Sequence, residues 1–184
     1  SAQAKALALS AYLDGVELAS VAQPRLGADW AGLCAAGLAA ALAPDATPES
    51  VIDTVLRLAH ENNRDLFYQM NYPTRGAEWM QTASDADFAA WWLNYYGRGF
   101  GRPADHWGGV NPMAFILPLL KRYADRPELF MRLVLAPQPP TWTGEFAEGR
   151  SPYAVIGGAL LGALHGAGLF PSEWRAWAEP QTAP

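Results

Sequence analysis

The 184-residue sequence is poor in cysteine and in positive charge. Its one cysteine, Cys34, excludes an internal disulfide, and its place in the apolar run of residues 31–43 predicts a buried, unreactive thiol. Thirteen Lys and Arg oppose 18 Asp and Glu, which gives a net charge of −5. Because phosphate binding draws on clustered positive charge, this balance argues against nucleic acid as a partner.

Several signatures of common enzymes and of membrane proteins are also missing. GxSxG, HExxH, CxxC and the phosphate-binding loop do not occur, so the usual hydrolase, metalloprotease and nucleotidase classes have no support. The apolar run at 151–166 is built largely from Gly and Ala, which predicts a core helix rather than a membrane span. The N-terminus has no signal-peptide pattern. We therefore expect a cytoplasmic protein without a membrane partner.

What is present is helical periodicity along most of the chain, with almost no strand signal. Helix starts are predicted at Thr47 with Pro48, at Ser84 with Asp87, at Asn111 with Pro112 and at Pro127. Pro118 should bend its helix unless packing absorbs the distortion. The expected architecture is an all-α helical bundle in one domain, residues 1–178, with a flexible tail at 179–184.

Small residues mark two helices as the centre of this bundle. Gly158, Gly162 and Gly166 recur at every fourth position of the run 151–166, and the run 32–43 is equally rich in Gly and Ala. Glycine lets two helices approach closely, at an entropic cost that the close packing must offset. The sequence therefore predicts a Gly/Ala-rich central helix pair.

The stretches 25–66, 106–136 and 156–174, taken together and in this order, resemble the ADP-ribosylglycohydrolase family. "IGGALLGALHGAGLFPSEW" at 156–174 is similar to the Gly/Ala-rich helix and tryptophan-bearing turn that end that family. The paired helices of 25–66 and the His, Asn and apolar helix of 106–136 are similar to its preceding segments, in the same order. The resemblance covers about residues 25–177 and implies the family's helical fold.

The metal motifs of that family are absent. Its members bind two magnesium ions through an Asp-Asp-Thr motif near the N-terminus and an Asp-Thr-Asp motif before the Gly/Ala-rich helix. In the second place this sequence has Gly149, Arg150 and Ser151, and an arginine repels a dication. We expect no metal and no cofactor. Relative to the family, the chain starts midway through the fold, which implies a shortened core, a homo-oligomer or a second polypeptide that completes it.

The candidate ligand-binding residues are Asn63, Arg64, His106 and Trp107; no catalytic residue is assigned. Asn63 and Arg64 lie in "HENNRDL", where the related family places residues that line its cleft. Arg64 either binds a carboxylate or phosphate through its planar guanidinium, or is a buried structural arginine paired with Asp65 or a helix end. His106 and Trp107 lie in the glycine-bearing loop 97–110, where a solvated or capping histidine is the alternative.

Aromatic residues are unusually frequent near these candidates. They are Trp79, Trp91, Trp92, Tyr95, Tyr96 and Trp107. The helical spacing of the four residues at 91–96 favours packing in the core. The second interpretation is that these rings form a stacking wall for a planar ligand, or an interface with a partner.

Three functions stay open. The chain binds a small molecule, or performs metal-free chemistry, in the cleft of an ADP-ribosylglycohydrolase-like fold. Alternatively it is one subunit of a two-chain enzyme, or a structural or protein-interaction module.

Overall fold

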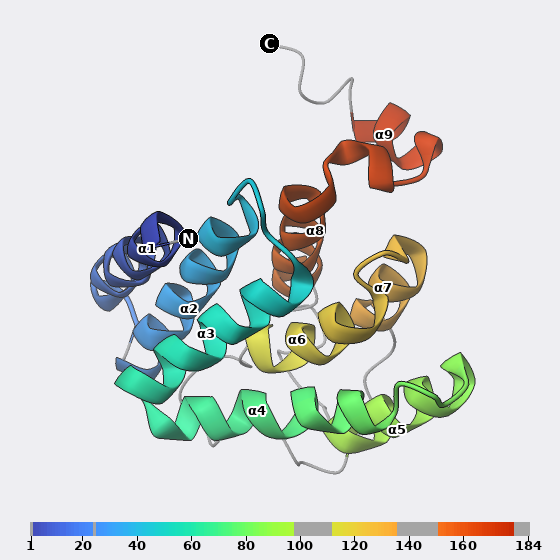
Figure 1. The fold of residues 1–184 in the computed structure, drawn as a ribbon, viewed down its shortest axis with the longest axis horizontal. Helices are drawn as coiled ribbons and strands as arrows, with labels where there is room; N and C mark the ends of the chain where they lie inside the picture. The colour runs from blue at the N-terminus through green and yellow to red at the C-terminus, as the bar shows by residue number, and fades with distance from the viewer. Residues whose placement is uncertain (1, 24, 98–111, 136–150, 179–184) are drawn as a thin grey trace.

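The computed structural model describes residues 2–23, 25–97, 112–135 and 151–178, and every regular element in these ranges is helical (Figure 1). The all-α prediction is therefore confirmed. Residues 98–111, which include the predicted cap Asn111, residues 136–150 and the tail 179–184 lie outside the described residues. The helices are α1 (Ala2–Ser20), α2 (Arg25–Ala41), α3 (Pro48–Asn62), α4 (Arg64–Trp79), α5 (Asp85–Gly97), α6 (Pro112–Tyr123), α7 (Pro127–Val134), α8 (Ser151–His165) and α9 (Ser172–Ala178), with the short 3-10 helix η2 (Ala167–Leu169) before the last.

The predicted helix starts on α3, α5 and α7 are present. The Thr47 hydroxyl accepts a hydrogen bond from the Ser50 N–H at 3.1 Å, and the Ser50 hydroxyl accepts one from the Thr47 N–H at 2.9 Å. This reciprocal pair satisfies two backbone donors that a helix start leaves open. At α5 the Ser84 hydroxyl accepts from the Asp87 N–H at 3.1 Å and donates to the Asp87 carboxylate at 2.7 Å, so this pair satisfies one backbone donor.

Helix α6 lies at the centre of the bundle and contacts α2, α3, α4, α7 and α8. Every residue from Met113 to Leu120 is buried, so the helix has no solvent-facing side along this stretch. Pro118 is one of these residues, and the helix continues through it to Tyr123. Packing from several neighbours holds the turn in which the proline removes a backbone hydrogen bond.

Helices α1 and α2 form the tightest seam between small residues. A Cβ added to Gly32 would lie 2.7 Å from the Tyr12 carbonyl oxygen, and one added to Gly15 would lie 2.9 Å from the Gly32 Cα. Distances this short leave no room for any side chain. The two backbones therefore approach each other through glycine, side by side in Figure 1.

Helices α2 and α8 also pack together, but not through a glycine seam. Gly37 on α2 lies near Leu160 of α8, whereas Gly158 and Gly162 on α8 have only Met131 and Phe170 side-chain atoms at 3.7–4.0 Å. Gly166 has φ +75° and follows the last residue of α8, so it ends the helix instead of extending its glycine face. The sequence thus predicts the small-residue helices correctly but misassigns their closest contact.

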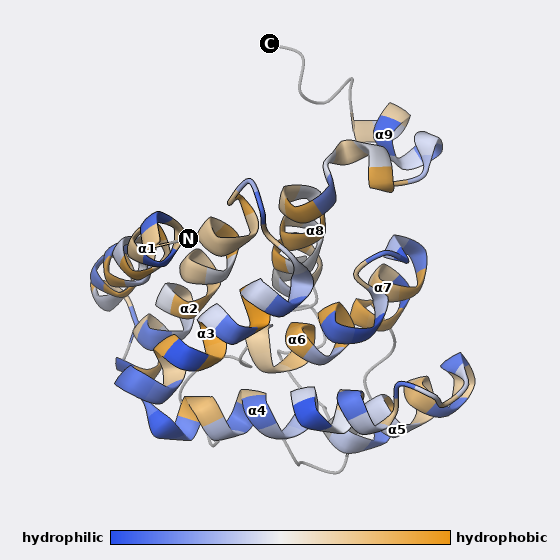
Figure 2. Cartoon of the chain, viewed as in Figure 1, coloured by the Kyte–Doolittle hydropathy of each residue, from blue (hydrophilic) through white to orange (hydrophobic). Residues whose placement is uncertain are grey.

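The helices differ in polarity. Figure 2 shows α6 and α8 mainly in hydrophobic colours and α4 mainly in hydrophilic ones. Helix α1 exposes several large apolar side chains, and α9, away from the rest of the bundle in Figure 1, has no buried residue. Among the described helices, none combines the length and apolar character that a membrane crossing requires.

Candidate functional site

The predicted site residues that the structure describes lie where α3 meets α4. Asn63 is the single residue between the two helices, and Arg64 is the first residue of α4. His106 and Trp107 lie outside the described residues, as do Gly149 and Arg150. The site is therefore built here from α3, α4 and the helices that hold their junction.

The carboxylate of Asp29 anchors this junction from inside the bundle. Asp29 is 7% exposed and, with Thr74, is one of two buried polar or charged residues in the described ranges. Its Oδ2 accepts a hydrogen bond from the Asn63 amide nitrogen at 2.9 Å, and its Oδ1 accepts a longer one from the Tyr12 hydroxyl at 3.4 Å. One buried acid on α2 thus links α1 to the α3–α4 junction.

Asn63 uses both ends of its side-chain amide. While the nitrogen donates to Asp29, the amide oxygen accepts from the Leu66 N–H at 3.3 Å and caps α4. An asparagine at this position satisfies an open backbone donor, and the second bond fixes the rotamer in which it does so. The start of α4 is therefore held in one orientation relative to α2.

The same buried environment changes the pKa of Tyr12. Burial, followed by the nearby negative charge of Asp29, raises the pKa of Tyr12 to about 12. The phenol is therefore neutral at physiological pH and acts as a hydrogen-bond donor to the carboxylate.

Arg64 projects from this fixed frame into solvent. It is exposed, and within the described part of the chain its guanidinium has no ion pair and no hydrogen-bond acceptor. The interpretation of Arg64 as a buried structural arginine is therefore wrong. An exposed guanidinium on the first turn of a helix can bind a carboxylate or phosphate with two parallel hydrogen bonds.

Aromatic rings lie beside Arg64 along the chain. The His60 and Phe67 rings meet edge to face with centroids 5.0 Å apart, and Phe67 contacts Tyr68 at 5.4 Å. Tyr68 is 48% exposed, so one of these rings is open to a ligand. The junction thus offers a cation and an accessible aromatic ring, which together suit an anionic molecule with a planar group.

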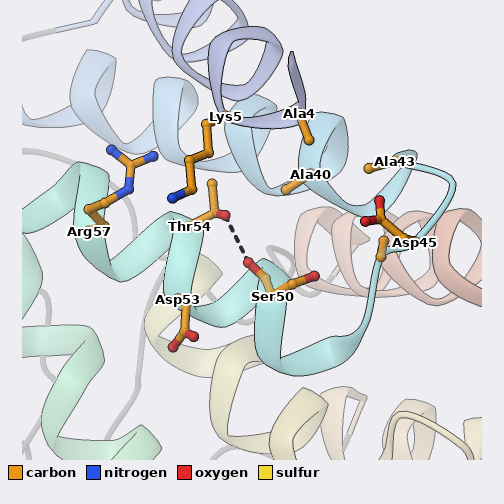
Figure 3. Close-up of a pocket in the computed structure, with 10 residues that line it drawn as sticks. Ala4, Lys5, Ala40, Ala43, Asp45, Ser50, Asp53, Thr54 and Arg57 are labelled. Carbon is orange, nitrogen blue, oxygen red and sulfur yellow. Dashed lines mark hydrogen bonds between the residues drawn. The ribbon is translucent and has the colours of Figure 1, made fainter. Parts of the chain in front are cut away.

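A separate groove, away from the α3–α4 junction, lies between α3, α1 and the C-terminal end of α2 (Figure 3). It has a volume of about 280 Å³, and alanines from α1, α2 and the following turn line part of it. Figure 3 shows Lys5 and Arg57 at one end and Asp45 at the other. Arg57 is already paired with Glu61 at 3.0 Å, and Thr54 donates to the Ser50 carbonyl at 2.8 Å. Ser50, Thr54 and Arg57, half of the polar side chains that line the groove, therefore have partners.

The aromatic residues of α5 divide as the core-packing interpretation predicts. Trp92 is 1% exposed and meets the Phe115 ring at a centroid distance of 4.2 Å. Trp91 is partly buried, and its ring closes over Gly76 of α4. Trp79, by contrast, is 81% exposed at the end of α4, and Trp107 lies outside the described residues.

Cys34 and two further described histidines, His60 and His165, are the other side chains with possible catalytic or metal-binding chemistry. Cys34 is half-buried, not fully buried as predicted, but burial of its thiol raises the pKa to about 12, which fits an unreactive cysteine. His60 and His165 are both exposed. In the ranges that the structure describes, no three His, Cys, Asp or Glu side chains are grouped so that they could hold a metal ion.

Comparison with known proteins gives no match: no protein-family model, curated protein or solved structure is similar to this chain.

Two residues of the junction, Asp29 and Tyr12, were assigned no role in the sequence analysis. Asp29 is the one acidic residue in α2. A lone carboxylate in a helix of alanine, glycine and leucine is a usable signal, because a buried charge needs hydrogen-bond donors. Tyr12 carried no comparable signal, since its partner lies 17 positions away.

Proposed function

We propose that the chain is a ligand-binding helical protein of ADP-ribosylglycohydrolase-like architecture, with its site at the α3–α4 junction. The proposed ligand is a small anion with a planar ring, in the class of ADP-ribose and related nucleotides. The observation that carries the proposal is the exposed Arg64 guanidinium, without an ion pair among the described residues, on a helix start that buried Asp29 holds through Asn63.

Preorganisation is the physical reason to choose this place. A binding residue is most effective when the backbone that carries it is fixed before the ligand arrives. Asn63 provides this for Arg64, because its side chain is bonded both to Asp29 and to the first turn of α4. In this proposal the guanidinium binds a phosphate or carboxylate, and the open face of Tyr68 stacks on the planar group.

The proposed activity does not use the two-magnesium centre of the related family. Magnesium is held in near-octahedral geometry by carboxylate and carbonyl oxygens. The residues at the corresponding place, Gly149, Arg150 and Ser151, supply one hydroxyl and one positive charge instead. These residues do not fit the metal pair, so binding, or a reaction without metal, is the consistent role.

Isothermal titration calorimetry with ADP-ribose tests the proposal. We expect binding to the wild-type chain in the micromolar range, and a loss of about tenfold or more in Arg64→Ala because a charge-assisted bidentate pair is removed. Arg132→Ala, which removes an exposed arginine from α7, is the matched control and should bind like wild type. Equal affinity in all three proteins, or tight binding that requires added magnesium, would contradict the proposal.

A second candidate function is binding of another polypeptide along α1. Leu7 and Leu18 lie on one side of α1 and are 57% and 77% exposed, and Leu42 at the end of α2 is 70% exposed. Leu7 and Leu42 line a groove of about 480 Å³ between the two helices. Exposed apolar groups grouped in a groove are typical of protein-binding surfaces. Leu7→Asp with Leu42→Asp should abolish co-purification of a partner from the native source without lowering stability.

A further inference from the structure

The outer face of α4 carries a stripe of alternating cations and aromatic rings. Arg64, Tyr68, Tyr72, Arg75 and Trp79, here called the α4 stripe, follow one another at spacings of four, four, three and four residues. At about 100° per residue these positions fall within an arc of about 80°, so they share one face of the helix. All five are exposed; Tyr68, Tyr72 and Trp79 are 48%, 65% and 81% exposed.

The residue types in the α4 stripe are those found at the centre of protein interfaces. Tyrosine, tryptophan and arginine are the residues that most often dominate the binding energy of protein interfaces. The rings of Tyr68 and Tyr72 already stack, with centroids 6.0 Å apart and planes at 26°. Within the described residues neither Arg64 nor Arg75 forms an ion pair, a property they share with Arg25, Arg132 and Arg175, so both stripe guanidiniums are available to a partner.

The order of residues along the stripe is self-complementary. If two copies of α4 lie antiparallel with a two-fold axis between residues 71 and 72, Arg64 of one copy faces Trp79 of the other. In the same register Tyr68 faces Arg75, and the two Tyr72 side chains lie beside the axis. Each guanidinium is then opposite an aromatic ring, the arrangement that favours cation–π contact. A two-fold interface requires this kind of match, because one surface must complement itself.

We propose that the α4 stripe is a homodimer interface, in which a second copy of this chain packs its α4 antiparallel against the first. A ring exposed by half or more contributes about 100 Å² when covered, so three rings and two arginines bury about 500–600 Å² per copy. The total is near the lower limit for specific interfaces, which corresponds to a reversible dimer.

Charge decides between a second copy and a single-stranded nucleic acid, which also binds aromatic and cationic stripes. The chain has a net charge of −5, and Asp65 and Glu78 lie on the same helix as the stripe. A phosphate backbone is negative along its whole length and brings no cation, whereas a second copy brings two arginines along with its own Asp65 and Glu78, and Glu78 is already paired with Lys121 at 3.5 Å. The proposal does not rest on ligand binding at Arg64, because it follows from the order of residues along the whole stripe. The dimer covers Arg64 and Tyr68, so a ligand bound to these side chains should shift the chain toward the monomer.

Sedimentation velocity over a concentration series tests the proposal on the full chain. Wild type should pass from monomer to dimer with a midpoint in the micromolar range. Trp79→Ala should weaken association about tenfold or more, since it removes the ring opposite Arg64 at both ends of the interface. Trp177→Ala is the matched control, because it removes a tryptophan that is 71% exposed on α9, and should dimerise like wild type.

A cysteine placed at the axis tests the register. Tyr72→Cys should form an intermolecular disulfide under mild oxidation, because only residues beside the two-fold axis meet their own copy. Arg132→Cys, exposed on α7, should form no intermolecular disulfide although it still dimerises reversibly, and the raised pKa of the half-buried Cys34 thiol keeps background reaction low in both proteins. A monomer at all concentrations, or a dimer that Trp79→Ala does not weaken, would overturn the proposal. Binding of a short oligouridine to a chain that stays monomeric, lost in Trp79→Ala, would assign the stripe to nucleic acid instead.

Discussion

The replacement Asn63→Asp tests the buried junction most selectively, because it keeps the helix cap and changes only the partner of Asp29. Asparagine and aspartate are about equally good at a helix N-cap, and a negative charge is favoured there by the helix dipole. If capping were the only role of Asn63, the variant would be as stable as wild type or slightly more stable. The structure predicts the opposite, because the Asn63 amide nitrogen donates to Asp29 at 2.9 Å.

In the variant, two carboxylates would replace this hydrogen-bonded pair. At that separation and an effective dielectric constant of about 20, two like charges repel by about 6 kcal/mol. Residue 63 is half-buried, so rotation of the new carboxylate toward water relieves part of this repulsion. The loss of the hydrogen bond leaves a buried acceptor with one donor fewer. We expect a net loss of about 2–4 kcal/mol in the free energy of unfolding at pH 7.

Urea denaturation of wild type and variant at a series of pH values measures this loss. The deficit should shrink as the pH falls below 7, because protonation of one carboxyl of the like-charged pair removes the repulsion and restores a donor. Asn94→Asp, the same change at an exposed position of α5, is the control and should alter stability by less than about 0.5 kcal/mol. A variant as stable as wild type at pH 7 would refute the contact between Asn63 and Asp29.

Three further predictions follow from buried polar groups. The raised pKa of Tyr12, about 12 against 10 in the unfolded chain, means that its contribution to stability is present below pH 10 and is lost as the pH rises to about 12. The unfolding free energy of wild type should therefore fall by on the order of 2 kcal/mol more than that of Tyr12→Phe over this window, and parallel curves would contradict it. Cys34 should react with a thiol reagent at pH 8 only after addition of guanidinium, since its thiol is buried; stoichiometric labelling of the folded chain within minutes would show otherwise. Arg122 donates to the Met80, Gln81 and Ala83 carbonyls at 2.5–2.7 Å. Arg122→Ala should therefore lower the free energy of unfolding, measured by thermal denaturation, by about 3–5 kcal/mol. A loss below about 1 kcal/mol would show that these three hydrogen bonds do not stabilise the fold.

The secondary structure was predictable because local chemistry decides it. Thr47 followed by Pro48 marks a helix start whatever lies around it, and the structure shows the expected cap. The apolar run after Pro112 likewise predicts a buried helix, and α6 is buried along nearly its whole length.

Tertiary contacts between small residues were not predictable in the same way. Gly158 and Gly162 have the spacing of a close helix contact, yet the described glycines at which an added Cβ would meet the backbone of another helix are Gly15 and Gly32. Glycine spacing shows that an approach is possible but not which helix makes it, since a glycine face has no side chain that selects a partner. Asp29 illustrates the same limit, because its donors come from residues 17 and 34 positions away.

The candidate site was half predictable. The concentration of amides and an arginine in "HENNRDL" indicated the α3–α4 junction, and Asn63 and Arg64 lie there. Asn63 points inward and has a structural role, whereas Arg64 is exposed. These roles depend on which side of the junction faces α2, and the sequence alone does not determine that orientation.

The most direct test of the proposed ligand site is an NMR titration of the ¹⁵N-labelled chain with ADP-ribose. We predict that backbone amide shifts change in a saturable way for residues 63–68, around Arg64 and Tyr68, and that residues lining the groove of Lys5 and Arg57 do not respond. The Arg64→Ala protein should show the same dispersed spectrum without the titration. Shifts confined to the groove between α1, α2 and α3, or no saturable shift at the α3–α4 junction, would contradict this account.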